Sequence, residues 1–226
     1  MSYVIPAPAI PSLPVAGSAA RFPVRRIYCV GRNYSEHARE MGNDVREPPF
    51  FFAKPGDALS EDGTRLPYPA ATQNLHHEAE LVIAIGVAGQ NIPEEEALSH
   101  VWGYAAGNDL TLRDVQDEAK KMRRPWDISK GFDGSAVVGA IHPAQGPLPA
   151  ESAITLTVNG ETRQQGVLGD MIWPVEGIIA HLSRLVALAP GDLIFTGTPA
   201  GVGPLAPGDI CTVEIAGLSP VTVQIV

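Results

Sequence analysis

The feature that most constrains this chain is an acidic sequence that runs directly into a hydrophobic one. Residues 76–80 (HHEAE) are followed by residues 81–85 (LVIAI), and the hydrophobic run ends at Gly86. Its β-branched residues predict a buried strand with the acidic pair at its entrance. Because side chains alternate along a strand, we expect Glu78 and Glu80 on one face.

Two carboxylates on one strand face repel each other. At a separation of about 4 Å the repulsion is about 4 kcal/mol if the effective dielectric constant is near 20. A divalent cation bound between Glu78 and Glu80 reverses the sign of that interaction. The pair therefore predicts a metal site, and the alternative is a solvated strand end whose charges face water.

Composition places the chain among soluble globular proteins. It has 226 residues, enough for one large domain or two small ones, and 45% of them are hydrophobic. A net charge of −9 argues against a nucleic-acid or anionic-membrane partner. No hydrophobic run approaches the roughly 20 residues that span a bilayer, and prolines interrupt the segment where a signal peptide would lie. We expect a cytoplasmic protein, with Cys29 and Cys211 buried in its core.

Strand signals outnumber helix signals, and the two do not alternate regularly. They predict an α+β fold with a rolled, barrel-like, mostly antiparallel β core and short flanking helices. We expect residues 1–24 to form a Pro-rich arm, extended on the surface or on a partner subunit, and residues 25–226 to form a single domain. The elements expected are strands over 26–31, 81–85, 101–106 and 136–141, helices over 35–41, 111–122 and 174–188, a helix start at 93, a loop over 130–134 and a hairpin around Asn159 and Gly160.

A third acidic residue, Asp109, follows one predicted strand and precedes a helix whose first residues have capping-box spacing. By itself Asp109 has the ordinary interpretation of a turn or cap residue. Together Glu78, Glu80 and Asp109 offer three hard oxygen ligands, which suit Mg²⁺, Mn²⁺ or Ca²⁺ better than zinc. We expect His76 and His77 to support such a site from outside the ligand set, or to pack.

Two further pairs of residues carry groups suited to catalysis. His37 and Glu40 are three apart on a predicted helix, so the carboxylate can orient the imidazole as a base. An exposed helical ion pair is the alternative. Lys54 and Lys130 lie in predicted loops of low charge, where they are either solvated or supply positive charge to an anionic substrate.

Other candidates lie on a helix and in a glycine-rich turn. Arg113 and Gln116 are three apart on the helix that begins beside Asp109. Residues 196–203 (TGTPAGVG) form a turn whose amides and Thr198 hydroxyl can hold a carboxylate, although the spacing is neither that of a P-loop nor that of a dinucleotide fold. The cationic candidates for a second substrate carboxylate are Arg32, Lys54, Arg113, Arg123 and Arg124.

Seven motifs occur in a fixed order along the chain. They are residues 31–34 (GRNY, followed by a His and a Glu), 52–55 (FAKP), 76–81 (HHEAEL), 107–114 (GNDLTLRD), 129–133 (SKGFD), 158–160 (VNG) and 196–203 (TGTPAGVG). Together, over roughly residues 25–226, they resemble the fumarylacetoacetate hydrolase family, in the short form typical of acylpyruvate and fumarylpyruvate hydrolases.

The resemblance implies roles for these residues. It implies that Glu78, Glu80 and Asp109 bind Mg²⁺ or Mn²⁺, with Ca²⁺ as a substitute. It also implies a catalytic dyad on a mobile lid and a catalytic lysine, and it implies that residues from the helix and the glycine-rich turn bind substrate. The catalytic set is His37, Glu40 and Lys130. The expected substrate-binding set is Arg32, Lys54, Arg113, Gln116 and Thr198.

From these residues and the resemblance we expect a metal-dependent hydrolase that cleaves the C–C bond of a β-diketo acid, an acylpyruvate for which fumarylpyruvate is the first candidate, giving fumarate and pyruvate. Its partner is then a small anionic keto acid, and the resemblance implies a homodimer. Oxaloacetate decarboxylation or dienoate isomerisation on the same scaffold is the first alternative, because both share the enolate intermediate. The second alternative is a binding module, not an enzyme, with a structural cation.

Overall fold

The computed structural model describes residues 2–34 and 48–226. Its largest sheet is mixed: β15 pairs in parallel with β3 and β11 with β5, and the other pairs are antiparallel. The strand order is β4-β3-β15-β8-β9-β11-β5, and β12 also pairs with β9. These strands are β3 (Arg26–Gly31), β4 (Phe50–Lys54), β5 (Leu59–Glu61), β8 (Ala79–Ile85), β9 (Val101–Asp109), β11 (Ala136–Val138), β12 (His142–Pro143) and β15 (Asp192–Phe195).

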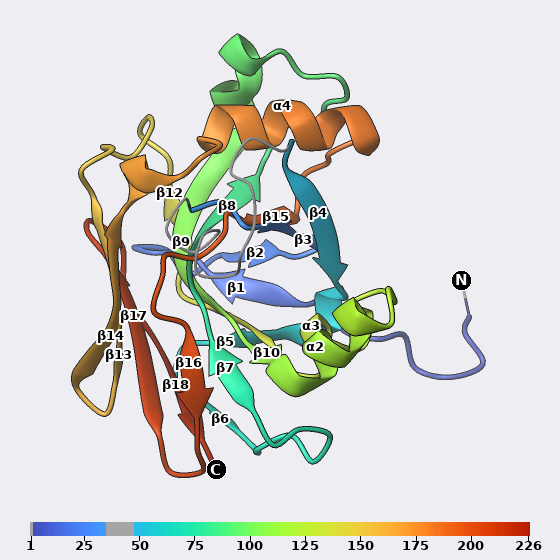
Figure 1. The fold of residues 1–226 in the computed structure, drawn as a ribbon. Coiled ribbons are helices and arrows are strands. Elements are labelled where there is room, and N and C mark those ends of the chain that lie inside the picture. Colours follow the sequence, from blue (N-terminus) through green and yellow to red (C-terminus); the bar gives the residue numbers. More distant parts are fainter. Residues whose placement is uncertain (1, 35–47) are drawn as a thin grey trace.

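A second sheet, with the order β14-β13-β17-β18-β6, stands against the first (Figure 1). A smaller sheet has the order β10-β7-β16. The strands of these two sheets are β6 (Thr64–Leu66), β7 (Leu75–His77), β10 (Thr111–Leu112), β13 (Ala153–Val158), β14 (Glu161–Val167), β16 (Gly203–Leu205), β17 (Ile210–Ile215) and β18 (Val221–Ile225). The sheet-rich α+β architecture expected from the sequence is confirmed.

Strand β8 lies between two hydrophobic cores. Leu81, Ile83 and Ile85 belong to the core shared with the second sheet. Val82 and Ala84 point to the opposite face and belong to the other core. Because both faces are covered, the strand needs hydrophobic residues at every position, which explains its unbroken sequence.

The N-terminal segment is not the extended surface arm that its prolines predict. β1 (Ser12–Pro14) and β2 (Arg21–Pro23) form an antiparallel hairpin. Leu13 is fully buried and Phe22 nearly so, both in the core on the Val82 face of β8. The alternation of prolines with hydrophobic residues does not predict such a hairpin, because the burial of the hairpin depends on strands far along the chain. Residues 2–10 are exposed.

Short helices flank the sheets, with α4 at one end and α2 and α3 beside β10 (Figure 1). In residues 2–34 and 48–226 the α-helices are α2 (Arg113–Lys121), α3 (Asp127–Lys130) and α4 (Val175–Leu185), and 3-10 helices cover Gly56–Ala58, Glu94–His100 and Leu168–Asp170. No helix among the described residues is long and apolar enough to cross a membrane. The helix expected over 35–41 lies outside the described residues.

Several local predictions need correction. β9 continues through Asp109, so this residue ends the strand instead of following it. The predicted capping box is absent: Thr111 belongs to β10 and its hydroxyl donates to the Asp109 carbonyl, so the helix begins only at Arg113. Lys130 ends α3 instead of lying in a loop. The hairpin turn is confirmed, with φ of 53° at Asn159 and 82° at Gly160.

Two predicted lengths also differ. The strand expected over 136–141 ends at Val138. The helix expected over 174–188 covers Val175–Leu185, with Pro174 as its N-cap. The acidic helix start at residue 93 is confirmed as a 3-10 helix whose N-cap is Pro93.

Candidate active site

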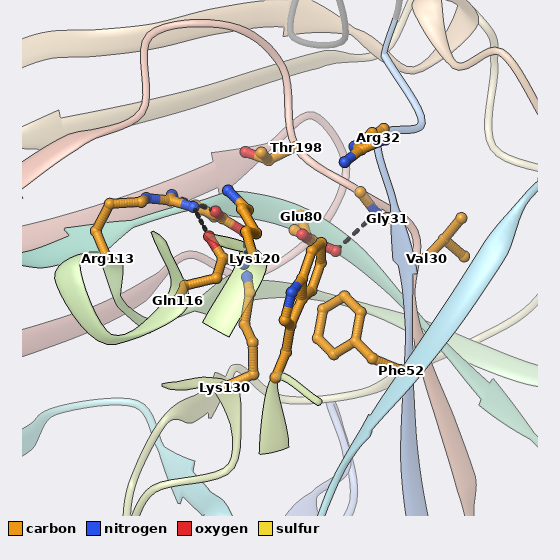
Figure 2. Close-up of a pocket in the computed structure, with 13 residues that line it drawn as sticks. Val30, Gly31, Arg32, Phe52, Glu80, Arg113, Gln116, Lys120, Lys130 and Thr198 are labelled. Carbon is orange, nitrogen blue, oxygen red and sulfur yellow. Dashed lines mark hydrogen bonds and ion pairs between the residues drawn. The ribbon is translucent and has the colours of Figure 1, made fainter. Parts of the chain in front are cut away.

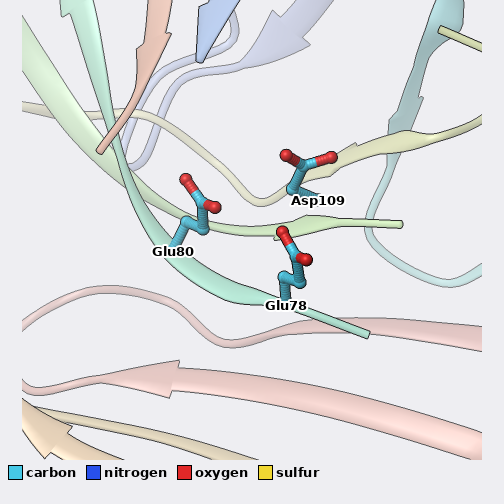
Figure 3. A group of neighbouring side chains, drawn as sticks. All are labelled: Glu78, Glu80 and Asp109. Atoms are coloured by element: carbon cyan, nitrogen blue, oxygen red, sulfur yellow. The ribbon is translucent and has the colours of Figure 1, made fainter. Parts of the chain in front are cut away.

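Glu78, Glu80 and Asp109 meet where β8 begins and β9 ends (Figure 3). The two strands are antiparallel, and the Asp109 amide donates to the Glu78 carbonyl at 2.9 Å. The Glu78 amide in turn donates to Asn108 Oδ1 at 3.0 Å. All three acids are buried, and one carboxylate oxygen from each lies within 4.8 Å of the others. The strand register therefore brings together three acids that are up to 31 positions apart in the sequence.

Within this cluster, the surroundings of Glu80 favour a proton or a metal cation on its carboxylate. Burial raises the pKa of Glu80 well above its ordinary value, and the Asp109 and Glu78 carboxylates raise it further. The Gly197 amide donates to Glu80 Oε2 at 2.7 Å and opposes that shift. Buried Asp109 Oδ1 receives no hydrogen bond within the described part of the chain, although the Lys54 ammonium lies 2.7 Å away.

The donor set fits a hard divalent cation. Mg²⁺ binds oxygen ligands at about 2.1 Å in an octahedron, which places neighbouring ligand oxygens about 3 Å apart and opposite ones about 4 Å apart. The separations within the cluster of Glu78, Glu80 and Asp109 are compatible with that geometry. All three ligands are carboxylates, so the site suits Mg²⁺ or Mn²⁺.

Besides Lys54, two more cationic side chains lie beside the three acids. Lys130 Nζ lies 2.7 Å from Glu78 Oε2 and 2.8 Å from Asp109 Oδ2. Arg113 Nη2 lies 2.5 Å from Glu78 Oε1. Burial lowers the pKa of Lys130, but the carboxylates of Asp109 and Glu78 raise it more, so the net shift is upward and the ammonium stays charged.

The position of Lys54 differs from that expected of a substrate-binding residue. It is the last residue of β4, its side chain is fully buried, and it does not line the pocket above the acids. Its ammonium donates to three backbone carbonyls, those of Leu110, Lys130 and Ser135. Lys54 therefore fixes the backbone around Asp109 and Lys130 instead of facing a ligand.

A pocket of about 40 Å³ opens above the carboxylates (Figure 2). Gln116 Oε1 accepts from Arg113 Nη1 at 2.7 Å, and Thr198 Oγ1 accepts from Gln164 Nε2 at 2.8 Å. The pocket is lined by Val30, Gly31, Arg32, Phe52, Glu78, Glu80, Arg113, Gln116, Lys120, Trp126, Lys130, Gly197 and Thr198. The structure thus brings Arg32, Gln116 and Thr198, three of the expected substrate-binding residues, to one cavity, and their role in binding stays a prediction.

Other predicted residues lie elsewhere. Arg123 and Arg124 are exposed at the end of α2 and do not line the pocket. His37 and Glu40, the expected catalytic dyad, lie outside the described residues.

His76 accepts from Arg113 Nε at 3.3 Å, and its pKa is lowered to about 4 by burial and by the Arg113 charge. His76 is therefore neutral near pH 7 and supports Arg113.

Sequence reasoning missed Gln164, Lys120 and Trp126. Gln164 is buried on β14, where its side-chain oxygen accepts from the Ala79 amide and its nitrogen donates to Thr198. The polar stretch around it carries no signal that singles out one glutamine. Lys120 and Trp126 line the pocket, but one looks like an ordinary surface lysine of an amphipathic helix, and the other follows that helix in an arginine- and proline-containing loop.

Comparison with known proteins identifies the family of the chain. Residues 26–226 match the family described as Fumarylacetoacetate (FAA) hydrolase C-terminal. The oxaloacetate tautomerase FAHD1, mitochondrial, of Homo sapiens is 43% identical over 202 residues, which cover 89% of this chain and 91% of that protein. Oxaloacetate tautomerase YcgM of Escherichia coli (strain K12) is 41% identical over 208 residues, 91% of this chain and 95% of its own.

A solved structure is closely similar over the full length. The crystal structure of fumarylpyruvate hydrolase from Pseudomonas aeruginosa in complex with Mn²⁺ and pyruvate superposes with a TM-score of 0.96 at 49% identity. The match covers 100% of this chain and 99% of that one. With the family match over nearly the whole chain, these similarities show that the protein belongs to the fumarylacetoacetate hydrolase family of enzymes.

Proposed function

We propose that this protein hydrolyses the C–C bond of an acylpyruvate, with fumarylpyruvate as the substrate and fumarate and pyruvate as the products. The observation that carries the proposal is the buried cluster of Glu78, Glu80 and Asp109, bridged by Lys130 and open to a pocket. The 49% identity to a fumarylpyruvate hydrolase described with Mn²⁺ and pyruvate supports the same substrate class.

The three acids would hold Mg²⁺ or Mn²⁺ in this scheme. When bound, the cation supplies positive charge that polarises the keto and carboxylate oxygens of the pyruvyl end. The Thr198 hydroxyl and the Gln116 amide line the same pocket and position the pyruvyl carboxylate. The charged Lys130 ammonium, next to the acids, donates a hydrogen bond to the oxygen that becomes the enolate.

The sequence motif supplies the base. His37, oriented by Glu40, takes a proton from water, and the water oxygen adds to the acyl carbonyl carbon. The C–C bond then breaks, its electron pair passes to the pyruvyl fragment as an enolate, and a proton returned by His37 gives pyruvate. Lys130 stabilises the negative charge while it develops, which lowers the barrier to an otherwise poor leaving group.

The direct test is an absorbance assay of fumarylpyruvate with Mg²⁺ or Mn²⁺ added. We expect consumption of the substrate with equal amounts of fumarate and pyruvate formed, and loss of turnover in EDTA. K130M and H37A should each lower kcat by about 100-fold or more, because each removes a group that acts in the transition state. Metal-loaded protein that forms no fumarate would contradict the proposal.

Oxaloacetate tautomerisation is a second candidate, favoured by relatives of that name at 41% and 43% identity. It needs the same enolate and the same positive charge, but no water attacks and no C–C bond breaks. The discriminating measurement is a parallel assay of enol-to-keto conversion of oxaloacetate and of pyruvate release from it. Fast conversion without fumarate formation from fumarylpyruvate favours tautomerisation, and pyruvate release from oxaloacetate indicates decarboxylation.

We also propose that the protein is a homodimer in the cytoplasm, because the motif resemblance implies a homodimer. Sedimentation equilibrium with and without Mn²⁺ measures the mass directly. A monomer under both conditions contradicts that expectation.

A further inference from the structure

The pocket contains more positive charge than its acids neutralise. Among the described residues that line it, the cationic side chains are Arg32, Arg113, Lys120 and Lys130. Arg113 and Lys130 are paired with the buried carboxylates. Within the described part of the chain, the ion pair that Lys120 makes is with Asp117, at 3.3 Å, and that side chain is 61% exposed. An i,i+3 ion pair in which one partner is well exposed to water contributes little, so the Lys120 ammonium can also bind a ligand.

Aromatic rings hold these two remaining cations in place. The Arg32 guanidinium lies 5.3 Å from the centre of the Phe50 ring. The Lys120 ammonium lies 5.6 Å from the centre of the Trp126 ring. Phe50 and Trp126 contact each other edge to face, with 5.4 Å between ring centres. The rings restrict both cations without neutralising them, since a cation–π contact adds no negative charge.

Arg32, Lys120 and Thr198 line the same pocket (Figure 2). Arg32 has a φ of 60°, a left-handed conformation that is costly for arginine and aims its side chain from the end of β3. The Lys120 side chain is only 26% exposed, and burial lowers its pKa. Arg32 is half-buried as well, so both groups face a site that is partly removed from water.

Charge balance sets the class of ligand. Glu78, Glu80 and Asp109 are matched in charge by Lys54, Arg113 and Lys130, so a bound divalent cation makes the inner site positive by its own charge. A keto acid with one carboxylate cannot neutralise the sum of the charge on the bound cation and the charges on Arg32 and Lys120. A substrate with a second carboxylate removes more of the repulsion among these positive charges.

We propose that Lys120 and Arg32 bind a second carboxylate at the far end of the acyl chain, and thereby select dicarboxylic over monocarboxylic substrates. This inference rests on the proposed function and names the substrate class of the same site. Trp126 lies against Lys120, where its ring offers a flat surface to a planar, conjugated acyl chain between the two carboxylates.

The test compares two substrates and two adjacent lysines. Fumarylpyruvate carries the second carboxylate and acetylpyruvate lacks it. K120M removes the proposed contact, whereas K121M removes the same charge from an exposed neighbour on α2. We expect K120M to lower kcat/KM for fumarylpyruvate by about 10- to 100-fold, mainly through KM, and to change acetylpyruvate turnover by less than about threefold. K121M should match the wild-type protein on both substrates.

Further variants and measurements guard against a purely structural effect. K120R keeps the charge and should recover most of the selectivity. R32N tolerates the left-handed backbone while removing the guanidinium, and should lower the preference for fumarylpyruvate in the same direction. Inhibition by fumarate should weaken in K120M, whereas inhibition by pyruvate should not. Equal losses on both substrates, or an unchanged preference, overturn the inference. Wild-type protein that turns over neither substrate instead contradicts the proposed function.

Discussion

Gln164 on β14 donates a hydrogen bond of 2.8 Å to the hydroxyl of Thr198, 34 residues further along the chain. The same side chain donates to the Pro199 carbonyl at 2.8 Å and accepts from the Ala79 amide at 3.0 Å and from His77 Nδ1 at 3.1 Å. One buried amide therefore joins the glycine-rich turn to the strand junction that carries Glu78. It fixes the positions of these two sides of the pocket relative to each other.

Replacing this amide should weaken both stability and the site. Q164L leaves several buried polar groups without partners, each costing about 1–3 kcal/mol, so we expect the free energy of unfolding to fall by at least about 2 kcal/mol. Q165L is the matched control, because Gln165 is exposed on the same strand and should change stability by less than about 0.5 kcal/mol. Urea unfolding of the two variants measures the difference, and equal stabilities would mean that the Gln164 bonds contribute nothing net.

Lys54 is predicted to be structural. K54M removes an ammonium that lies 2.7 Å from Asp109 and binds three buried carbonyls. We expect a loss of about 3–5 kcal/mol in metal-free protein, because a buried carboxylate loses part of its compensation. Mn²⁺ should recover part of that loss by supplying positive charge to the same acids. Denaturant unfolding in EDTA and in Mn²⁺ tests this. A K54M protein as stable in EDTA as K121M contradicts the assignment.

The raised pKa of Glu80 predicts how stability changes with pH. Burial and the carboxylates of Asp109 and Glu78 raise this pKa above its ordinary value of 4.5, so the folded metal-free protein retains a proton that the unfolded chain loses. The contribution is fully present below about 4.5, and it is lost as the pH rises through the folded pKa. The free energy of unfolding of metal-free protein should therefore fall with rising pH relative to E80Q.

A bound cation reverses that trend, because it prefers the deprotonated carboxylate. Stabilisation by Mn²⁺ should grow from about pH 5 to about pH 8 in the wild-type protein and should be much smaller in E80Q. Thermal unfolding in EDTA and in Mn²⁺ at several pH values measures both effects. A Mn²⁺ shift that does not depend on pH, or one that E80Q retains in full, argues against Glu80 as a ligand.

The N-terminal hairpin should contribute to the core. L13A removes a fully buried side chain that packs with Val82 and Phe195, and we expect a loss of about 2–5 kcal/mol. I10A is the control, since Ile10 is 73% exposed three residues earlier and should change stability by less than about 0.5 kcal/mol. Thermal denaturation of the two variants gives the comparison. An L13A protein with wild-type stability would show that the hairpin is dispensable.

The sequence by itself determined the features that depend on local pattern. The β-branched run of β8 predicted a buried strand, and Asn159 with Gly160 predicted the hairpin turn, because period and turn chemistry act over a few residues. The same local reasoning placed Glu78 and Glu80 on a strand end. It failed at Thr111, where capping-box spacing was overridden by the pairing of β10 with β7.

Only the tertiary structure decided which distant groups meet. The register between β8 and β9 places Asp109 beside Glu78. Packing directs the Lys54 ammonium to backbone carbonyls, whereas Lys120 lines the pocket. Gln164 hydrogen-bonds to both Ala79 and Thr198 because β14, in the second sheet, lies next to the site. The sequence around a lysine or glutamine does not show which groups it will contact. Those contacts are fixed by packing between segments that are far apart in the sequence.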